Sequence, residues 1–181
     1  MKKRLFLILI LVLLALASCS SGKYDFKLKS AFSEETSLKD FKNDKLIIYF
    51  GYTFCPDVCP ASLSLVGKIL KQISSKEARL LFISLDLARD SDINATNEWL
   101  RYFYQRADAL IAASESDLEK VTKAYGVKIK KVVMKDSLMQ YSIAHSNELF
   151  LIDKGGKFVK SINDFSPEEL SKELRNFLNF N

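Results

Sequence analysis

The sequence is poor in the residues that mark low-complexity chains: it has 6 glycines and 3 prolines among 181 residues, and only 1 histidine. Collagen-like and low-complexity chains are thereby excluded. No glycine-rich phosphate loop, nucleophile elbow or paired-carboxylate motif is present, so the enzyme classes that depend on those motifs have no support. The length and the hydrophobic share of 48% are instead those of one packed domain.

A large excess of charge of one sign is also missing. The formal net charge is +5, but three of the positive charges are Lys2, Lys3 and Arg4 at the start of the chain. Without them 24 basic residues face 22 acidic ones, which is a balance of +2. No face rich in lysine and arginine with interleaved aromatic residues follows, so we expect no nucleic-acid partner.

The first eighteen residues have the pattern of an export signal. A basic start precedes thirteen uninterrupted apolar residues, from Leu5 to Ala17, and small residues then lead to Cys19. A transmembrane helix needs roughly 20 apolar residues, so this run is short for a membrane span. The pattern therefore favours a cleaved signal, with an uncleaved N-terminal anchor as the alternative.

The segment Leu16-Ala-Ser-Cys19 resembles the lipobox of bacterial lipoproteins, in which the cysteine is diacylated and becomes the mature N-terminus. We therefore predict a lipoprotein signal peptide over residues 1–18, a tether over 19–30 and a folded domain over 31–181. The predicted location is the bacterial cell envelope, with the domain on the periplasmic side and tied to the membrane through Cys19. The uncleaved anchor would also leave the domain outside the cytoplasm.

With Cys19 assigned to the lipid, Cys55 and Cys59 remain as a pair. Each is followed by a proline, Pro56 and Pro60, and a proline disfavours the α conformation for the residue before it. We expect Cys59 to be a helix N-cap and Pro60 to be the first helical residue.

The flanking segments place this pair at a strand-to-helix turn. Residues 45–50 are a dense run of β-branched and aromatic residues that predicts a buried strand, and residues 61–73 carry apolar residues at helical spacing. Open α/β sheets place their sites at the carboxyl ends of such strands. A helix N-terminus also favours thiolate over thiol, which promotes both nucleophilic attack and metal binding.

The remainder of the chain alternates in the manner of an α/β fold. The predicted elements are a strand over 79–85, a helix over 93–106, a short strand over 109–113, a helix over 116–125 with a Ser116/Glu119 capping box, a hairpin of 148–153 with 157–161, and a final helix that begins at Ser166. This order predicts a thioredoxin-like α/β sandwich, in which helices flank a central mixed sheet.

Residues 50–60, Phe-Gly-Tyr-Thr-Phe-Cys-Pro-Asp-Val-Cys-Pro, closely resemble the signature of the Sco (SenC) family. Its members are membrane-tethered thioredoxin-fold proteins that help to assemble the binuclear copper site of cytochrome c oxidase. The resemblance extends over roughly residues 24–180. It includes the Asp86…Arg89-Asp90 cluster after the second strand and His145-Ser146 before the last hairpin.

This resemblance implies that Cys55, Cys59 and His145 bind copper. Two thiolates and an imidazole suit Cu(I) and can also accept Cu(II). The implied function is that of a copper chaperone, with the copper-site subunit of cytochrome c oxidase or another copper protein as its partner. Asp86 is a second-rank candidate, as a charge beside the site.

The sequence departs from the family pattern at two positions. Ala144 stands where many relatives have an acidic residue before the histidine, and Leu87 replaces a proline after Asp86. If the missing carboxylate normally orients the imidazole, copper affinity or release differs in this chain.

Other chemistries of the same residues stay open. The Cys55/Cys59 pair suits a thiol:disulfide oxidoreductase that keeps partner cysteines reduced and is itself served by a thioredoxin-like reductant. The Thr53-Phe-Cys55 start faintly resembles peroxiredoxins, but neither Cys59 nor the late histidine has a part in that chemistry. A Cys₂His zinc site is disfavoured because such donors bind copper more strongly than zinc.

Overall fold

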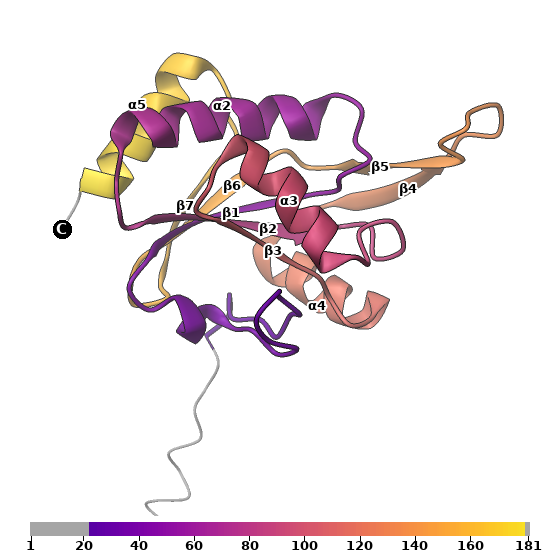
Figure 1. Ribbon diagram of the computed structural model, residues 1–181, viewed down its shortest axis with the longest axis horizontal. Coiled ribbons are helices and arrows are strands. Elements are labelled where there is room, and N and C mark those ends of the chain that lie inside the picture. Colours follow the sequence, from indigo (N-terminus) through magenta and orange to yellow (C-terminus); the bar gives the residue numbers. More distant parts are fainter. Residues whose placement is uncertain (1–21, 180–181) are drawn as a thin grey trace, which may run out of the picture.

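The computed structural model describes residues 22–179 and folds them into a sheet with helices on both faces (Figure 1). In chain order the elements are η1 (Leu38–Phe41), β1 (Lys45–Gly51), α2 (Val58–Ile73), β2 (Ala78–Ser84), α3 (Ile93–Phe103), β3 (Ala107–Leu110), α4 (Glu115–Tyr125), β4 (Ile129–Val133), β5 (Tyr141–His145), β6 (Leu149–Ile152), β7 (Phe158–Ile162) and α5 (Pro167–Asn179).

The central sheet has five strands in the order β3-β2-β1-β6-β7. β1 pairs parallel with β2 and antiparallel with β6, so the sheet is mixed. This arrangement confirms the predicted α/β sandwich. It also puts β1, which leads into the cysteine motif, at the centre of the sheet, where every residue of the strand is buried.

The side chains of β1 alternate between two cores. Ile47 and Tyr49 pack with residues of α2, α3 and α5 on one face. Leu46 and Ile48 pack on the other face with α4 and with the N-terminal segment around Phe26. Alternation of side chains along a strand is what allows one central strand to serve both layers.

The packed domain begins earlier in the chain than predicted. Residues 24–30 were expected to belong to the tether, but Phe26 and Leu28 are buried. The Tyr24 ring stacks on the Phe158 ring with their centroids 4.5 Å apart. These apolar contacts hold the segment against the domain.

The start of α4 also differs from the prediction. The helix begins at Glu115, and its N-cap is Ser114, whose hydroxyl accepts the backbone N–H of Asp117 at 3.2 Å. The predicted capping box of Ser116 and Glu119 lies inside the helix and is wrong. The observed cap lies two residues before the predicted one, and its hydroxyl accepts one of the unpaired N–H groups of the first helical turn.

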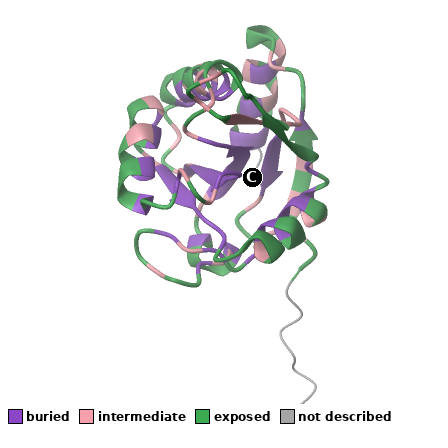
Figure 2. Cartoon of the chain, turned by 90° about the vertical axis from the view of Figure 1, so that its right-hand side faces the viewer, coloured by how far each residue is buried: buried purple, intermediate pink, exposed green. Residues whose placement is uncertain are grey.

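A two-stranded hairpin, β4–β5, was not predicted at all. Its strands pair antiparallel in the register Ile129↔His145 to Val133↔Tyr141. The hairpin projects from the body of the molecule (Figure 1), and every residue of β4 is exposed (Figure 2). Because β4 has no buried face, its sequence carries no alternation of apolar and polar residues.

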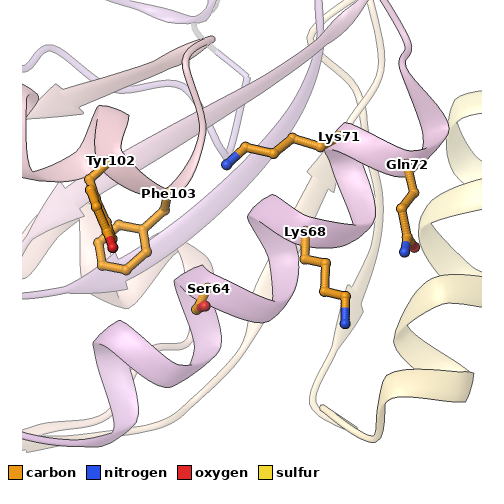
Figure 3. Close-up of a pocket in the computed structure, with 6 residues that line it drawn as sticks. All are labelled: Ser64, Lys68, Lys71, Gln72, Tyr102 and Phe103. Carbon is orange, nitrogen blue, oxygen red and sulfur yellow. The ribbon is translucent and has the colours of Figure 1, made fainter.

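Helices α2 and α3 approach each other closely at Gly67. A Cβ atom on this residue would lie 2.4 Å from the carbonyl oxygen of Phe103, so only glycine fits the contact. Beside it runs a groove lined by Lys68 and Lys71 of α2 and by Tyr102 of α3 (Figure 3).

Candidate metal centre

The two motif cysteines lie where β1 leads into α2. The helix begins at Val58 with Asp57 as its N-cap, so the predicted N-cap position of Cys59 is wrong and Pro60 is the third helical residue. Proline costs no intrahelical hydrogen bond there, because the N–H groups of a first helical turn have no partner within the helix.

Although Asp57 is the N-cap residue, the capping hydrogen bond is accepted by the sulfur of Cys55. This sulfur accepts the backbone N–H of Cys59 with an N···S distance of 3.4 Å, whereas the Asp57 side chain makes no capping hydrogen bond. Burial by itself would raise the pKa of Cys55, but hydrogen bonds from the backbone N–H groups of Asp57 and Cys59 outweigh it and lower that pKa. Cys59 is 0% exposed, and burial raises its pKa to about 12. Cys55 is therefore the thiol that ionises first.

His145 reaches this turn from the end of β5. Its Nε2 lies 3.4 Å from the sulfur of Cys59, and its Nδ1 lies 3.0 Å from the carbonyl oxygen of Ser146. A carbonyl oxygen only accepts hydrogen bonds, so the ring proton belongs on Nδ1 and the Nε2 lone pair faces Cys59. Burial lowers the pKa of His145, which keeps the imidazole neutral and able to bind a metal.

Aromatic rings and one glycine shape the space around these donors. Tyr49 and Tyr52 each turn a ring toward His145 at a centroid distance of 6.3 Å. A Cβ atom on Gly51 would lie 3.1 Å from the sulfur of Cys59 and 2.9 Å from the ring of Tyr49. The missing side chain therefore leaves room for the buried sulfur at the end of β1.

The donor set fits a copper ion. Two thiol sulfurs and an imidazole nitrogen with a free lone pair are ligands of the kind that Cu(I) prefers. As they stand, no three His, Cys, Asp or Glu side chains within residues 22–179 are grouped closely enough to hold an ion. Binding by all three donors would thus require a movement, for which the half-buried Cys55 has more freedom than the fully buried Cys59.

Asp86 lies beside the hairpin rather than beside the cysteines. Among the described residues, its carboxylate accepts the Tyr141 hydroxyl at 2.8 Å and forms an ion pair with Arg89. The guanidinium of Arg89 lies over the Tyr141 ring, 3.8 Å from its centroid. Tyr141 opens β5 and His145 ends it, so these contacts fix the hairpin that carries the histidine.

Asp90 supports the turn that contains the cysteines, although it was not predicted as a separate candidate. Its carboxylate accepts the backbone N–H of Thr53 at 3.2 Å and the Ser84 hydroxyl at 2.6 Å. Asp90 is 1% exposed, and burial raises its pKa. The only signal in the sequence was its place in the Asp86…Arg89-Asp90 cluster.

Asn147 holds the chain just after the histidine, and nothing in the sequence singled it out. Its Oδ1 accepts the Tyr49 hydroxyl at 2.9 Å, and its Nδ2 donates to the Ser62 hydroxyl at 3.2 Å. These bonds tie the segment behind His145 to β1 and α2. The histidine is therefore fixed from both sides, by Tyr141 before it and Asn147 after it.

Comparison with known proteins identifies the family of this chain. The family model described as SCO1/SenC matches residues 17–179. The chain belongs to the SCO1/SenC family. An SCO2-like protein of Rickettsia conorii is 34% identical over 155 residues, which cover 84% of this chain and 75% of that relative.

Solved structures give the same family and the fold. ScoI of Bradyrhizobium japonicum, solved with copper bound, is 32% identical with a TM-score of 0.68, and the match covers 85% of this chain and 98% of that one. The thioredoxin domain of a thiol-disulfide oxidoreductase from Bacteroides vulgatus matches at 17% identity with a TM-score of 0.58, over 86% of this chain and 94% of that one. At that identity the likeness concerns the fold alone, and it confirms the predicted thioredoxin-like architecture.

The predicted lipidation site lies outside the part of this SCO1/SenC chain that the structure describes. Cys19 and the signal over residues 1–18 precede residue 22, where the description begins. Within residues 22–179, no helix combines the length and the apolar character that crossing a bilayer requires.

The difference in pKa and exposure between Cys55 and Cys59 predicts that an alkylating reagent modifies one thiol before the other. At neutral pH, we expect iodoacetamide to modify Cys55 roughly ten times faster than Cys59 or more, because Cys55 is accessible and has the lower pKa. Peptide mapping by mass spectrometry after short exposures measures both rates. The Cys55→Ser variant is the control, in which the remaining thiol should react slowly. Equal rates in the parent protein would contradict the assignment of Cys55 as the ionised thiol.

Proposed function

We propose that this SCO1/SenC protein is an extracytoplasmic copper chaperone that binds copper through Cys55, Cys59 and His145 and serves the assembly of the copper site of cytochrome c oxidase. The observation that supports this most strongly is the 3.4 Å separation of His145 Nε2 and Cys59 Sγ, two atoms whose residues lie 86 positions apart in the chain. A histidine whose Nε2 lone pair faces a buried thiol is positioned to bind a metal ion together with that thiol. The copper-bound state of a relative with 32% identity supports the same cargo.

In this proposal copper is a cargo, and each residue has a distinct part in holding it. Cys59, which is fully buried, forms the inner side of the site, and the half-buried His145 lies against it, held by the fold on both flanks. Cys55 forms the accessible side, where an incoming thiolate of a partner can replace it. Ligand exchange that begins at Cys55 would let copper pass to the partner without release into solution.

A second candidate function is the reduction of partner disulfides. The pairing of an accessible thiol of lowered pKa with a buried one supports it. Cys55 would attack the partner disulfide, Cys59 would then displace the partner, and two partner thiols would form as Cys55 and Cys59 became a disulfide. A thioredoxin-like reductant would restore the pair.

Copper stoichiometry at the two redox levels tests the chaperone proposal. We expect the reduced chain without residues 1–19 to bind one Cu(I), and the Cys55–Cys59 disulfide form to lose this binding, because oxidation removes two of three donors. Copper analysis after gel filtration measures both states, and reduction of the oxidised sample should restore binding as a control. Undiminished binding by the oxidised form would refute the site.

We further propose that the signal over residues 1–18 is removed and that Cys19 is diacylated, which would tether the domain to the membrane on the periplasmic side of a bacterial envelope. The pattern Leu16-Ala-Ser-Cys19 supports this. We expect Cys19→Ser to abolish processing and leave the full-length precursor, which immunoblots of membrane fractions would show. Ser20→Ala should be processed normally. Normal cleavage of the Cys19→Ser precursor would point to an ordinary secretory signal.

A further inference from the structure

Exposed apolar side chains are concentrated on the β4–β5 hairpin and in the turn that carries Cys55. Ten large hydrophobic side chains are exposed within residues 22–179, and five of them lie on the β4–β5 hairpin: Ile129, Val132, Val133, Met134 and Leu138. Two more, Phe54 and Val58, lie in the turn that carries Cys55. The side chains of Val133 and Leu138 are 70% and 105% exposed. Exposed apolar residues that gather in this way mark an interaction surface.

The same hairpin carries a local excess of positive charge. Lys128, Lys130, Lys131 and Lys135 lie in or beside it, and the only acidic residue between positions 128 and 145 is Asp136. None of these lysines takes part in the ion pairs found among the described residues. The Nζ of Lys131 lies over the Tyr141 ring, 3.7 Å from its centroid. A net positive charge that no acidic side chain of the described residues pairs is available to an acidic surface on another molecule.

The hairpin is held in a fixed relation to the site. Its base carries His145, and the contacts of Tyr141 with Asp86 and Arg89 tie it to the loop after β2. β4 and β5 pair only with each other, and the Ile143 N–H of β5 donates to the Tyr52 hydroxyl of the turn that follows β1. A molecule that reaches the accessible sulfur of Cys55 will therefore meet a positioned arm beside it.

The direction of the hairpin favours a protein over a lipid surface as the occupant. Cys19 precedes residue 22 by three residues, which span at most about 10 Å. Lipid attachment at Cys19 would therefore hold the membrane near the place where the described chain begins, below the sheet in Figure 1. The hairpin leaves the molecule sideways from there (Figure 1).

We propose that the β4–β5 hairpin is the docking arm for the copper-accepting protein, and that this partner presents an apolar patch with an acidic rim around its own metal ligands. The inference rests on the proposed copper function and adds the chemistry of the partner. Val133 and Leu138 supply the apolar contact, and Lys130 and Lys135 supply the electrostatic attraction. The arm holds the acceptor while its ligands replace Cys55.

Copper transfer kinetics test this proposal. The donor is the copper-loaded protein, and the probe is the metal-free soluble domain of the copper-site subunit of cytochrome c oxidase from the same cells. The test variants are Lys130→Glu/Lys135→Glu and Val133→Ser/Leu138→Ser. The control is Lys68→Glu/Lys71→Glu, an equal charge reversal in the groove of Figure 3. These control lysines lie nine and twelve residues after Cys59 on α2, which is roughly 14–18 Å along the helix.

We expect both hairpin variants to bind copper with unchanged affinity and to transfer it roughly tenfold more slowly than the parent protein. The defect of the charge-reversed variant should shrink as salt is added, because salt screens exposed charges. The control should transfer at the parent rate. Unchanged copper affinity in the same samples shows that slower transfer does not come from a damaged site.

Each failure has a separate meaning. A parent protein that neither binds nor transfers copper would count against the proposed function itself. If the parent protein transfers copper and the hairpin variants transfer it at the same rate, the docking proposal is overturned and the proposed function is not. If the hairpin substitutions left transfer unchanged but abolished a dimer in sedimentation, the occupant of the hairpin would be a second copy of this chain. If they left transfer unchanged but abolished retention on vesicles of phosphatidylglycerol and phosphatidylethanolamine, the occupant would be a lipid surface. Either result would overturn the proposal.

Discussion

Replacement of His145 by alanine is expected to weaken copper binding by about a hundredfold or more, since even partners outside the ligand set change metal affinity by roughly 10–100-fold. The substitution removes the nitrogen that lies 3.4 Å from the sulfur of Cys59 and leaves two thiols. The hairpin should stay in place, because Tyr141 remains bound to Asp86 and the Ile143 N–H remains bound to the Tyr52 hydroxyl. Competition with a Cu(I) chelator measures the affinity.

The same variant separates the two proposed functions. Attack by Cys55 on a disulfide should keep its rate, because its helix N-terminus is unchanged. Ser142→Ala, on the same strand, is the matched control. An unchanged affinity would show that His145 is not a ligand. A fall in affinity with full oxidase activity in cells would favour the redox function over copper delivery.

Replacement of Gly67 by alanine is expected to lower the melting temperature by roughly 4–8 °C, which corresponds to about 2 kcal/mol for a domain of this size. The added Cβ would lie 2.4 Å from the carbonyl oxygen of Phe103 and 2.9 Å from its carbonyl carbon. Backbone atoms cannot rotate away, so α2 and α3 must separate, at a cost of about 3 kcal/mol. Alanine regains about 1 kcal/mol through its better helix propensity.

Gly22→Ala provides the matched control, because a Cβ there would meet no heavy atom within 4 Å. Its melting temperature should equal that of the parent protein, measured by circular dichroism on metal-free samples. A melting temperature of Gly67→Ala equal to or above the parent value would mean that the helices do not touch at this point.

The sequence predicted strands such as β1 that are buried and missed the β4–β5 hairpin, of which β4 has no buried face. β1 was predicted because every one of its residues is buried and apolar or aromatic side chains dominate it. β4 was missed because all five of its residues are exposed, so burial imposes no periodic pattern on its sequence. The start of α2 was predicted two residues too late, with Cys59 instead of Asp57 as the N-cap. Proline is tolerated throughout a first helical turn, so Pro60 does not fix the first residue of the helix.

The candidate site was predicted as a set of residues but not as a geometry. The motif and its resemblance gave Cys55, Cys59 and His145, yet no local rule relates positions that are 86 residues apart. The contacts that hold the histidine were also hidden. Asn147 accepts a hydrogen bond from Tyr49 of β1, and Tyr141 donates one to Asp86 in the loop after β2, so both depend on tertiary packing.

The central position of β1 has a consequence for the order of folding. β1 is paired on one side with β6, in a register that joins Tyr49 to Leu149, and His145 lies just before β6 in the chain. Pairings between such distant segments are slow to form. A chain that lengthens from its N-terminus therefore carries both thiols well before the imidazole, and they stay open to oxidation during this interval. Three-ligand copper binding becomes available only when β6 has paired with β1, so the moment of metal capture reports that this long-range pairing has formed.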